Sequence, residues 1–340
     1  MKGQEPVIEE PVFDTAQALA AGWTPGRLRG PSVRRLLNGV FTTSAYADTL
    51  EIRARAALVA AGPEARLCEA TALCLAGVEL PPGLAGPDEP VHIHTAVERC
   101  GPQREGVRVH RTALQLPVCE VSGMPALHLA ECWLQVASRA TVLELTVLGD
   151  GLMRRPRPPE YAPYLVGPDV LADAIAGSHR RPGIRRSRRS GHLLRPNTDS
   201  PMESVTRFYL VQAGLPEPCV NYPILDDEGF PVFYLDLAYP AQLVAVEYDG
   251  AVHAGDVARM KRDISRRRRL EDAGWRIITA SADDLPNKMA DVVRSVRREL
   301  AARTLLPAPP RVRMGGRNQV GPRRPAGVQP EGLANPAPTR

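Results

Sequence analysis

The stretch YLDLAYPAQLVAVEYDGAVH, residues 234–253, decides the fold of the C-terminal half of this chain. Two apolar runs, residues 232–238 and 243–248, lie on either side of the turn-forming sequence Pro240-Ala241-Gln242. Short apolar runs separated by a proline-containing turn are typical of two antiparallel β-strands. The sequence therefore predicts a largely buried strand pair at this point.

Three carboxylates, Asp236, Glu247 and Asp249, interrupt these apolar runs. An ionised carboxylate in a buried strand is costly unless it is paired or bound to a cation. Glu247 and Asp249 are two residues apart, so they would share one face of a strand, which Asp236 could reach from its neighbour. With His253 close by, the group suits a hard divalent cation and a water nucleophile. In a purely structural alternative, Asp236 caps a turn and the other two acids pair with arginines of the following helix.

The order of motifs around these acids resembles a known nuclease family. VEYDGAVH (residues 246–253), followed by RDISRRRRLEDAGWRII (residues 262–278), is similar to the Vsr-like branch of the PD-(D/E)xK nuclease superfamily, which is related to the very-short-patch-repair endonucleases. The resemblance covers roughly residues 203–285. Asp249 stands where the superfamily pattern has a lysine.

This resemblance implies an α/β domain with a restriction-endonuclease-like mixed sheet flanked by helices, and Mg²⁺ (or Mn²⁺) as cofactor. In this assignment Asp236 and Glu247 would be metal ligands and His253 the general base. Asp249 would be a further metal ligand or would orient His253. The resemblance also implies that Glu203, in the first turn of the preceding helix, leans toward the metal. The sequence offers Glu203 an equally good structural role, because Ser200 stands three residues earlier with the capping-box spacing.

A strongly basic helix is predicted over residues 257–273, directly after the acidic strand pair. A charged helix face is usually just solvated, but next to a nuclease site it could hold the phosphates flanking a scissile bond. The candidate DNA-binding residues of this helix are Arg262, Arg266, Arg267, Arg268 and Arg269.

Residues 15–41 predict a helix-turn-helix. A short helix, a turn at Gly22 and a second helix, capped by Thr24 with Pro25 at its first position, precede an extended GVF segment. Helix, turn, basic helix and strand is the order of a winged helix-turn-helix. The candidate DNA-binding residues around the second helix are Arg27, Arg29, Arg34 and Arg35.

Residues 11–155 as a whole resemble the AbiEi-type (type IV toxin-antitoxin) antitoxin-like transcriptional regulators of actinobacteria. The resemblance lies in GVF after the basic helix, in GMPALHLAECWLQVA (residues 123–137) and in GDGLMRR (residues 149–155). It implies a winged-helix head followed by a mixed α/β segment, with DNA as a partner. Residues 53–80 and 124–155 are expected to be mainly helical.

Two strands are predicted by their alternating pattern, VHIHT (residues 91–95) and GVRVHR (residues 106–111). They carry His92, His94 and His110, which could in principle form a metal site. A polar strand face is the simpler interpretation of these three histidines.

Composition sets the remaining bounds. At 340 residues and 44% hydrophobic content, the chain can form two domains, each with its own core. The net charge of +5 arises from arginines concentrated in residues 151–200 and 304–340, a distribution that suits a polyanionic partner such as DNA. The six cysteines contain no CxxC and no repeating pair, which argues against a zinc site and, in a chain of this size, against a disulfide framework. No apolar run approaches the length needed to cross a bilayer. The N-terminus is not that of a signal peptide, so a cytoplasmic protein without membrane contact is expected.

Five segments are expected. They are a winged helix-turn-helix-like head (1–52), an α/β regulator-like segment (53–155), a basic linker (156–200), a Vsr-like or restriction-endonuclease-like domain (201–303) and a disordered basic tail (304–340).

The favoured function is a metal-dependent nuclease that hydrolyses DNA phosphodiester bonds and carries an N-terminal DNA-binding regulator-like domain. The alternative is a non-catalytic DNA-binding transcriptional regulator or antitoxin, with a cognate toxin protein as partner. The acids favour the nuclease, because carboxylates beside DNA oppose its phosphates unless a cation bridges them.

Overall fold

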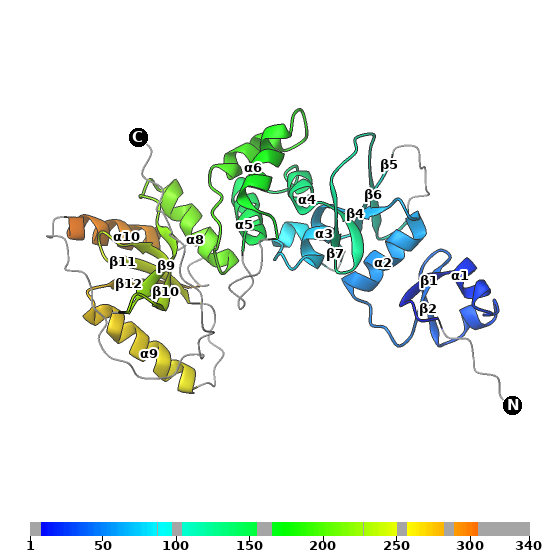
Figure 1. The fold of residues 1–340 in the computed structure, drawn as a ribbon, viewed down its shortest axis with the longest axis horizontal. Coiled ribbons are helices and arrows are strands. Elements are labelled where there is room, and N and C mark those ends of the chain that lie inside the picture. The colour runs from blue at the N-terminus through cyan, green and yellow to red at the C-terminus, as the bar shows by residue number, and fades with distance from the viewer. Residues whose placement is uncertain are drawn as a thin grey trace.

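The structure is a computed structural model that describes residues 8–86, 88–96, 104–154, 165–226, 228–249, 257–281 and 289–304. The side chains of residues 257–263 and 304 are outside this description. The chain forms α/β units with mixed and antiparallel sheets flanked by helices, which follow one another along the long axis of the molecule (Figure 1). None of the helices in the described ranges has the length and apolar character needed to cross a membrane.

The N-terminal unit is a small antiparallel sheet. Its elements are β1 (Val12–Asp14), α1 (Thr15–Ala20), the 3₁₀ helix η1 (Arg27–Arg29), β2 (Val33–Leu37) and β3 (Val40–Thr43). The strand order is β1-β3-β2, and all neighbours are antiparallel. Phe13 forms the centre of its core, with Trp23 at 5.1 Å and Phe41 at 6.3 Å between ring centroids.

The prediction of a second helix after Gly22 is wrong. Thr24 does cap a turn, since its hydroxyl accepts the amide of Arg27 at 3.2 Å, but only one 3₁₀ turn follows. The chain then becomes extended, so that Arg34 and Arg35 lie on β2 instead of on a helix. Val33 at the start of β2 is β-branched and favours a strand, and Pro31 ends any helix that begins at Pro25.

The middle unit is a five-stranded mixed sheet covered by helices. Its elements are α2 (Leu50–Ala61), β4 (Arg66–Leu67), α3 (Glu69–Leu75), the 3₁₀ helix η2 (Pro82–Leu84), β5 (Val91–Ala96), β6 (Val107–Thr112), β7 (Val118–Val121), β8 (Met124–Leu127), α4 (Leu129–Val136) and α5 (Val142–Leu152). The strand order is β6-β5-β4-β8-β7. The two strands predicted from VHIHT and GVRVHR are confirmed as β5 and β6, and they pair in parallel.

The prediction of a helical segment over residues 124–155 is wrong for its first four residues. Residues 124–127 form β8, which closes a hairpin with β7 through Ser122 and Gly123, both at positive φ. The helical part is divided into α4 and α5, whose break lies between Ala137 and Thr141. Thr141 starts α5 with a capping box.

Residues 156–200 were expected to form a linker, but the described residues 165–200 contain helices that pack against the middle unit. These helices are α6 (Pro168–Gly177) and α7 (Ile184–Gly191), which contact α4 and α5 respectively. Although α7 reads as an arginine run, Ser187 and Ser190 face inward and are fully buried. Arg186 donates to the carbonyl oxygens of Ala137 and Ser138 at 3.1 and 3.0 Å, which satisfies the open end of α4.

The C-terminal domain is a four-stranded mixed sheet between helices. Its elements are α8 (Pro201–Gln212), β9 (Cys219–Leu225), β10 (Pro231–Tyr239), β11 (Val244–Asp249), α9 (Val257–Asp272), β12 (Arg276–Ser281) and α10 (Met289–Thr304). The strand order is β12-β11-β10-β9. Strand β10 pairs antiparallel with β9 and with β11, and β12 pairs parallel with β11. The antiparallel pair predicted from residues 232–248 is thereby confirmed. Helix α9 connects the two parallel strands.

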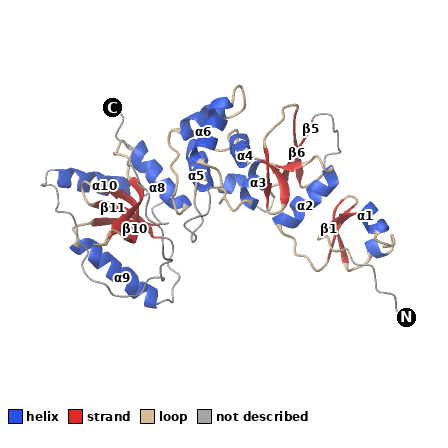
Figure 2. Cartoon of the chain, in the orientation of Figure 1, coloured by secondary structure: helices blue, strands red, loops and turns tan. Residues whose placement is uncertain are grey.

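Each face of this sheet carries its own apolar cluster. On one face, Leu237 and Val246 pack with α8 and α10, where Leu210 and Val296 are fully buried. On the other face, residues that include Ala245 pack with Leu270 of α9 and with Trp275. Figure 2 shows α9 on one side of the sheet and α8 and α10 on the other.

A buried ion pair joins the middle unit to the C-terminal domain. Arg207 of α8 donates to Asp150 of α5 at 2.7 Å, and both side chains are 0% exposed. Asp150 also accepts the backbone amide of Arg195 at 2.7 Å, and Arg207 donates to Glu217 at 3.0 Å. Helices α5 and α8 therefore form a shared interface instead of two separate surfaces.

Candidate functional site

The C-terminal acids predicted from sequence come from three elements. Glu203 lies in the first turn of α8, Asp236 on β10, and Glu247 and Asp249 on β11. In the β10–β11 ladder, Leu237 pairs with Val246, which places Asp236 and Glu247 at adjacent positions on neighbouring strands. The structure therefore brings Asp236 and Glu247 together, as predicted.

Glu203 is buried at 5% exposure and is held in place by the start of its own helix. Its carboxylate accepts the amide of Asp199 at 2.8 Å and the hydroxyl of Ser200 at 3.0 Å. The Ser200 hydroxyl in turn accepts the amide of Glu203 at 3.2 Å. These bonds confirm Ser200 as the N-cap of α8, but the carboxylate accepts the amide of Asp199 instead of that of Ser200, so the capping box is not complete.

Glu203 is also electrostatically coupled to the strand acids. Burial, and then the negative charge of Asp236, raise the pKa of Glu203 to about 7. This coupling places the Glu203 carboxylate near that of Asp236. The capping role and a role beside the strand acids are compatible in one side chain.

Asp236 and Glu247 have distinct protein partners. Asp236 accepts the backbone amide of Tyr248 at 2.9 Å across the strand pair. Glu247 receives a two-pronged contact from Arg266 of α9, at 2.5 and 3.3 Å. Burial raises the pKa of Glu247, the Arg266 charge counteracts this, and the Asp236 charge raises it further. The alternative in which an arginine of the following helix pairs with Glu247 is thus realised.

The remaining predicted residues of this region differ in position. Asp249, at the end of β11, is exposed. Arg267 donates to Thr279 at 2.7 Å, whereas Arg268 and Arg269 are exposed on α9. His253 and the side chain of Arg262 lie outside the described residues, so their predicted roles stay predictions.

The four N-terminal arginines do not form one surface of a helix. The guanidinium of Arg27 lies over the ring of Trp23, 4.0 Å from its centroid. Arg34 donates to the carbonyl oxygen of Tyr46 at 3.1 Å. Arg29 and Arg35 are exposed, and they lie on η1 and β2 respectively.

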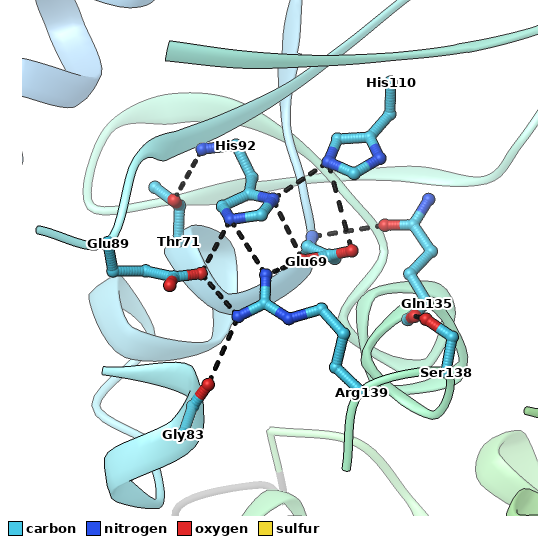
Figure 3. A network of polar contacts seen from close by, with 9 residues as sticks. All are labelled: Glu69, Thr71, Gly83, Glu89, His92, His110, Gln135, Ser138 and Arg139. Carbon is cyan, nitrogen blue, oxygen red and sulfur yellow. Dashed lines mark hydrogen bonds and ion pairs between the residues drawn. The ribbon is translucent and has the colours of Figure 1, made fainter. Parts of the chain in front are cut away.

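A second polar cluster lies in the middle unit, where two of the three predicted histidines meet. His92 of β5 and His110 of β6 lie beside Glu69 at the start of α3, and the potential ligand atoms of all three lie within 4.8 Å of one another (Figure 3). These three residues could hold a metal ion. His94 is outside the group; it is buried on β5, and burial lowers its pKa. The polar strand face expected for the three histidines misses the cluster that His92 and His110 form with Glu69.

Charge in this second cluster is balanced by neighbours that the sequence analysis did not single out. Arg139 donates to Glu69 at 3.1 Å and to Glu89 at 2.6 Å. Burial by itself would raise the pKa of Glu69, but the hydrogen bond and charge of His92 lower it below its ordinary value. Burial lowers the pKa of His110. Glu69, Glu89 and Arg139 are scattered over 70 residues, so no local spacing could have revealed them.

The two clusters offer different chemistry. Glu203, Asp236 and Glu247 supply oxygen ligands of the kind that Mg²⁺ and Mn²⁺ prefer. Among the described residues, the second cluster is the one that brings three potential ligand atoms within 4.8 Å of one another. The second cluster supplies two imidazole nitrogens and a carboxylate, which suit transition metals.

Comparison with known proteins identifies relatives but no family. No protein-family profile matches the chain, and no solved structure matches it. Two proteins of Mycobacterium tuberculosis, described as uncharacterized proteins MT2308 and Rv2248, are each 31% identical to it over 131 residues. The match covers 38% of this chain and 48% of each relative, so it spans about half the relatives' length.

Proposed function

We propose that this protein is a metal-dependent nuclease that hydrolyses DNA phosphodiester bonds at Glu203, Asp236 and Glu247. The observation that carries the proposal is the electrostatic coupling of three acids from separate elements: Asp236 raises the pKa of both glutamates, each of which is also raised by burial. Repelling acids in a partly buried site are costly to the fold. A bound cation offsets that cost.

The order of elements supports a restriction-endonuclease-like assignment for this domain. The domain consists of one helix, three antiparallel strands, a second helix and a parallel fourth strand, with Asp236 and Glu247 on the central strands β10 and β11 and Glu203 on the first helix. One fold can host many functions, so the support for nuclease activity comes from the acids of the site and not from the order of elements.

The carboxylates fit a hard cation such as Mg²⁺ or Mn²⁺, since Asp236 and Glu247 are adjacent and Glu203 couples to Asp236. When bound, such an ion lowers the pKa of a water molecule and stabilises charge on the phosphate. Arg266 holds Glu247 through two contacts and acts as the protein's own counter-ion for this acid. To bind the cation, Glu247 must give up at least one of its two contacts with Arg266.

The basic surface of α9 supports DNA as the substrate. Arg268 and Arg269 are exposed on the helix whose Arg266 contacts Glu247. Phosphate contacts of this kind position DNA without reading its sequence. Their loss should weaken binding and reduce its salt dependence, because fewer counterions are released.

The test is nicking of supercoiled plasmid by the full chain with Mg²⁺ or Mn²⁺. We expect cleavage that Asp236→Asn abolishes, since the carboxamide removes one ligand charge without changing size. Asp291→Asn is the matched control, because Asp291 lies on α10 with a side chain that is 60% exposed. Wild-type protein that cuts neither DNA strand with either ion would refute the proposal.

A second candidate function is DNA binding without cleavage, as in a regulator with a toxin protein as partner. The exposed Arg29 and Arg35 of the N-terminal unit favour it. The full chain carrying Arg29→Ala and Arg35→Ala should then lose a mobility shift of its own upstream DNA. An unchanged shift would remove the N-terminal unit from DNA binding.

A further inference from the structure

A second cluster of metal-ligating side chains lies far along the chain from the C-terminal acids. Glu69, His92 and His110 come from α3, β5 and β6, and each offers one potential ligand atom that lies within 4.8 Å of the other two (Figure 3). We propose that these three residues bind one divalent transition-metal cation of the Zn²⁺ class. The proposal is independent of the nuclease assignment.

The distances suit a single small cation. His92 Nδ1 lies 2.8 Å from His110 Nε2 and 2.9 Å from Glu69 Oε2, and His110 Nε2 lies 3.9 Å from Glu69 Oε1. Ligands of a tetrahedral zinc ion, with bonds of about 2.0–2.1 Å, are separated by roughly 3.3 Å. The observed separations lie on both sides of that value, so small movements suffice.

Protons alone satisfy this arrangement poorly. The Nδ1 atom of His92 faces both a carboxylate oxygen and the Nε2 atom of His110. A single N–H on Nδ1 has one direction and cannot serve both contacts with good geometry. A cation between the three groups contacts all of them at once.

The surroundings orient His92 for metal binding. Its other ring nitrogen, Nε2, lies 2.8 Å from Glu89 Oε1 and 3.3 Å from Arg139 Nη1. With the proton on Nε2 donated to the closer Glu89 carboxylate, the lone pair is on Nδ1. A metal-binding histidine almost always donates its second N–H to such a carboxylate or carbonyl. Arg139 contacts both Glu69 and Glu89 and offsets their negative charge, which limits the affinity for a cation but keeps the acids in place.

The backbone at Glu69 is a further, independent observation. Glu69 has φ of +51°, in the left-handed region that costs a residue with a side chain free energy. Its amide donates to Gln135 at 3.1 Å, which holds this conformation. Such outliers concentrate at functional sites because the surrounding structure maintains them. Here the conformation delivers the carboxylate to the two histidines.

The donor set determines the class of ion. Two imidazoles and one carboxylate are ligands for Zn²⁺, Fe²⁺ or Cu²⁺ and are unlike the all-oxygen sets of Mg²⁺. Three protein ligands leave at least one coordination position for water. His92 is fully buried, whereas the His110 side chain is 29% exposed, so solvent reaches the site from the His110 side.

The experiment titrates the full chain, purified without a histidine tag and treated with chelator, with Co²⁺ and then with Zn²⁺. We expect one equivalent of Co²⁺ to give visible absorption bands, which Zn²⁺ abolishes by displacement. His110→Ala should weaken binding by at least about tenfold, since removal even of a supporting residue costs 10–100-fold. Glu69→Gln, which keeps the shape and removes the charge, should also weaken binding.

Two controls make the result specific. His94→Ala removes a histidine of the same strand that lies outside the cluster, and Asp236→Asn removes the C-terminal acid; both should retain wild-type binding. Circular dichroism checks that each variant is folded, and Zn²⁺ should raise the melting temperature of the wild type but not of His110→Ala. The absence of saturable binding by the wild type would overturn the proposal, as would a loss of binding in Asp236→Asn but not in His110→Ala.

Discussion

Glu203 makes the stability of the C-terminal domain depend on pH in an unusual direction. Its pKa is raised from an ordinary value of 4.5 to about 7, first by burial and then by Asp236. A raised pKa means that the native state binds the proton more tightly than the unfolded chain. The stabilising contribution is therefore complete below pH 4.5 and is lost as the pH rises through about 7. We expect stability to fall over this range, where many proteins are most stable.

The size of the effect follows from the two pKa values. Each unit of pH over which the native state holds one extra proton changes the free energy of unfolding by about 1.4 kcal/mol. At about pH 5.5 the unfolded chain has already lost this proton, whereas native Glu203 keeps it up to about pH 7. The native state therefore holds one extra proton over about 1.5 pH units between about pH 5.5 and about pH 8. The expected loss is about 2 kcal/mol. In Glu203→Gln, which keeps a neutral hydrogen-bonding side chain, this part of the pH dependence should disappear.

Urea unfolding at the two pH values measures the effect, with the fluorescence of the tryptophans, including the buried Trp275, as the signal. Glu144→Gln is the matched control, because Glu144 forms the capping box of α5. It tests whether loss of a capping carboxylate alone changes the pH dependence. If wild type and Glu203→Gln have parallel pH profiles, the raised pKa of Glu203 is refuted. If the acids also bind Mg²⁺, the ion should restore the wild type's lost stability at about pH 8.

Other perturbations test the packing of the chain. Arg207→Met should lower the free energy of unfolding by about 3–5 kcal/mol because it leaves Asp150 buried and unpaired, whereas adding Asp150→Leu should recover much of the loss, as measured by urea unfolding. Gly183→Ala should lower the melting temperature, because Gly183 has φ of +82° and a Cβ would overlap the backbone of Ala137; an unchanged melting temperature would contradict this contact. Leu148→Ala, at a fully buried position of the main core, should cost about 2–5 kcal/mol in the same urea assay, and a loss below about 1 kcal/mol would mean that the core collapses around it.

Sequence reasoning succeeded where local signals and burial agree. The strand pair around Asp236 and Glu247 was predictable because apolar runs, a proline turn and embedded acids all indicate one arrangement. The cap of α8 at Ser200 was equally local. The pairing of the two strands predicted that Asp236 could reach the face of Glu247, whereas the register that places them opposite each other came from the structure.

The failures have different physical causes. The helix expected after Thr24 was replaced by a 3₁₀ turn and β2, because pairing with β3 outweighs the weak local start signal. The basic run in α7 looks like a solvated linker, but its serines face the core and Arg186 satisfies carbonyl groups of another helix. Glu69 could not be found at all, since it meets His92 only through the sheet topology.

The Asp150–Arg207 ion pair also determines where the chain can be divided. In the sequence, a natural cut lies near residue 200, before α8 begins. In three dimensions, such a cut leaves an acid of α5 at 0% exposure with its guanidinium partner on another polypeptide. A fragment of the middle unit should therefore keep α8 and Glu217 to remain well folded. The boundary relevant to expression, proteolysis and exchange of modules between proteins thus lies inside what the sequence presents as the C-terminal domain.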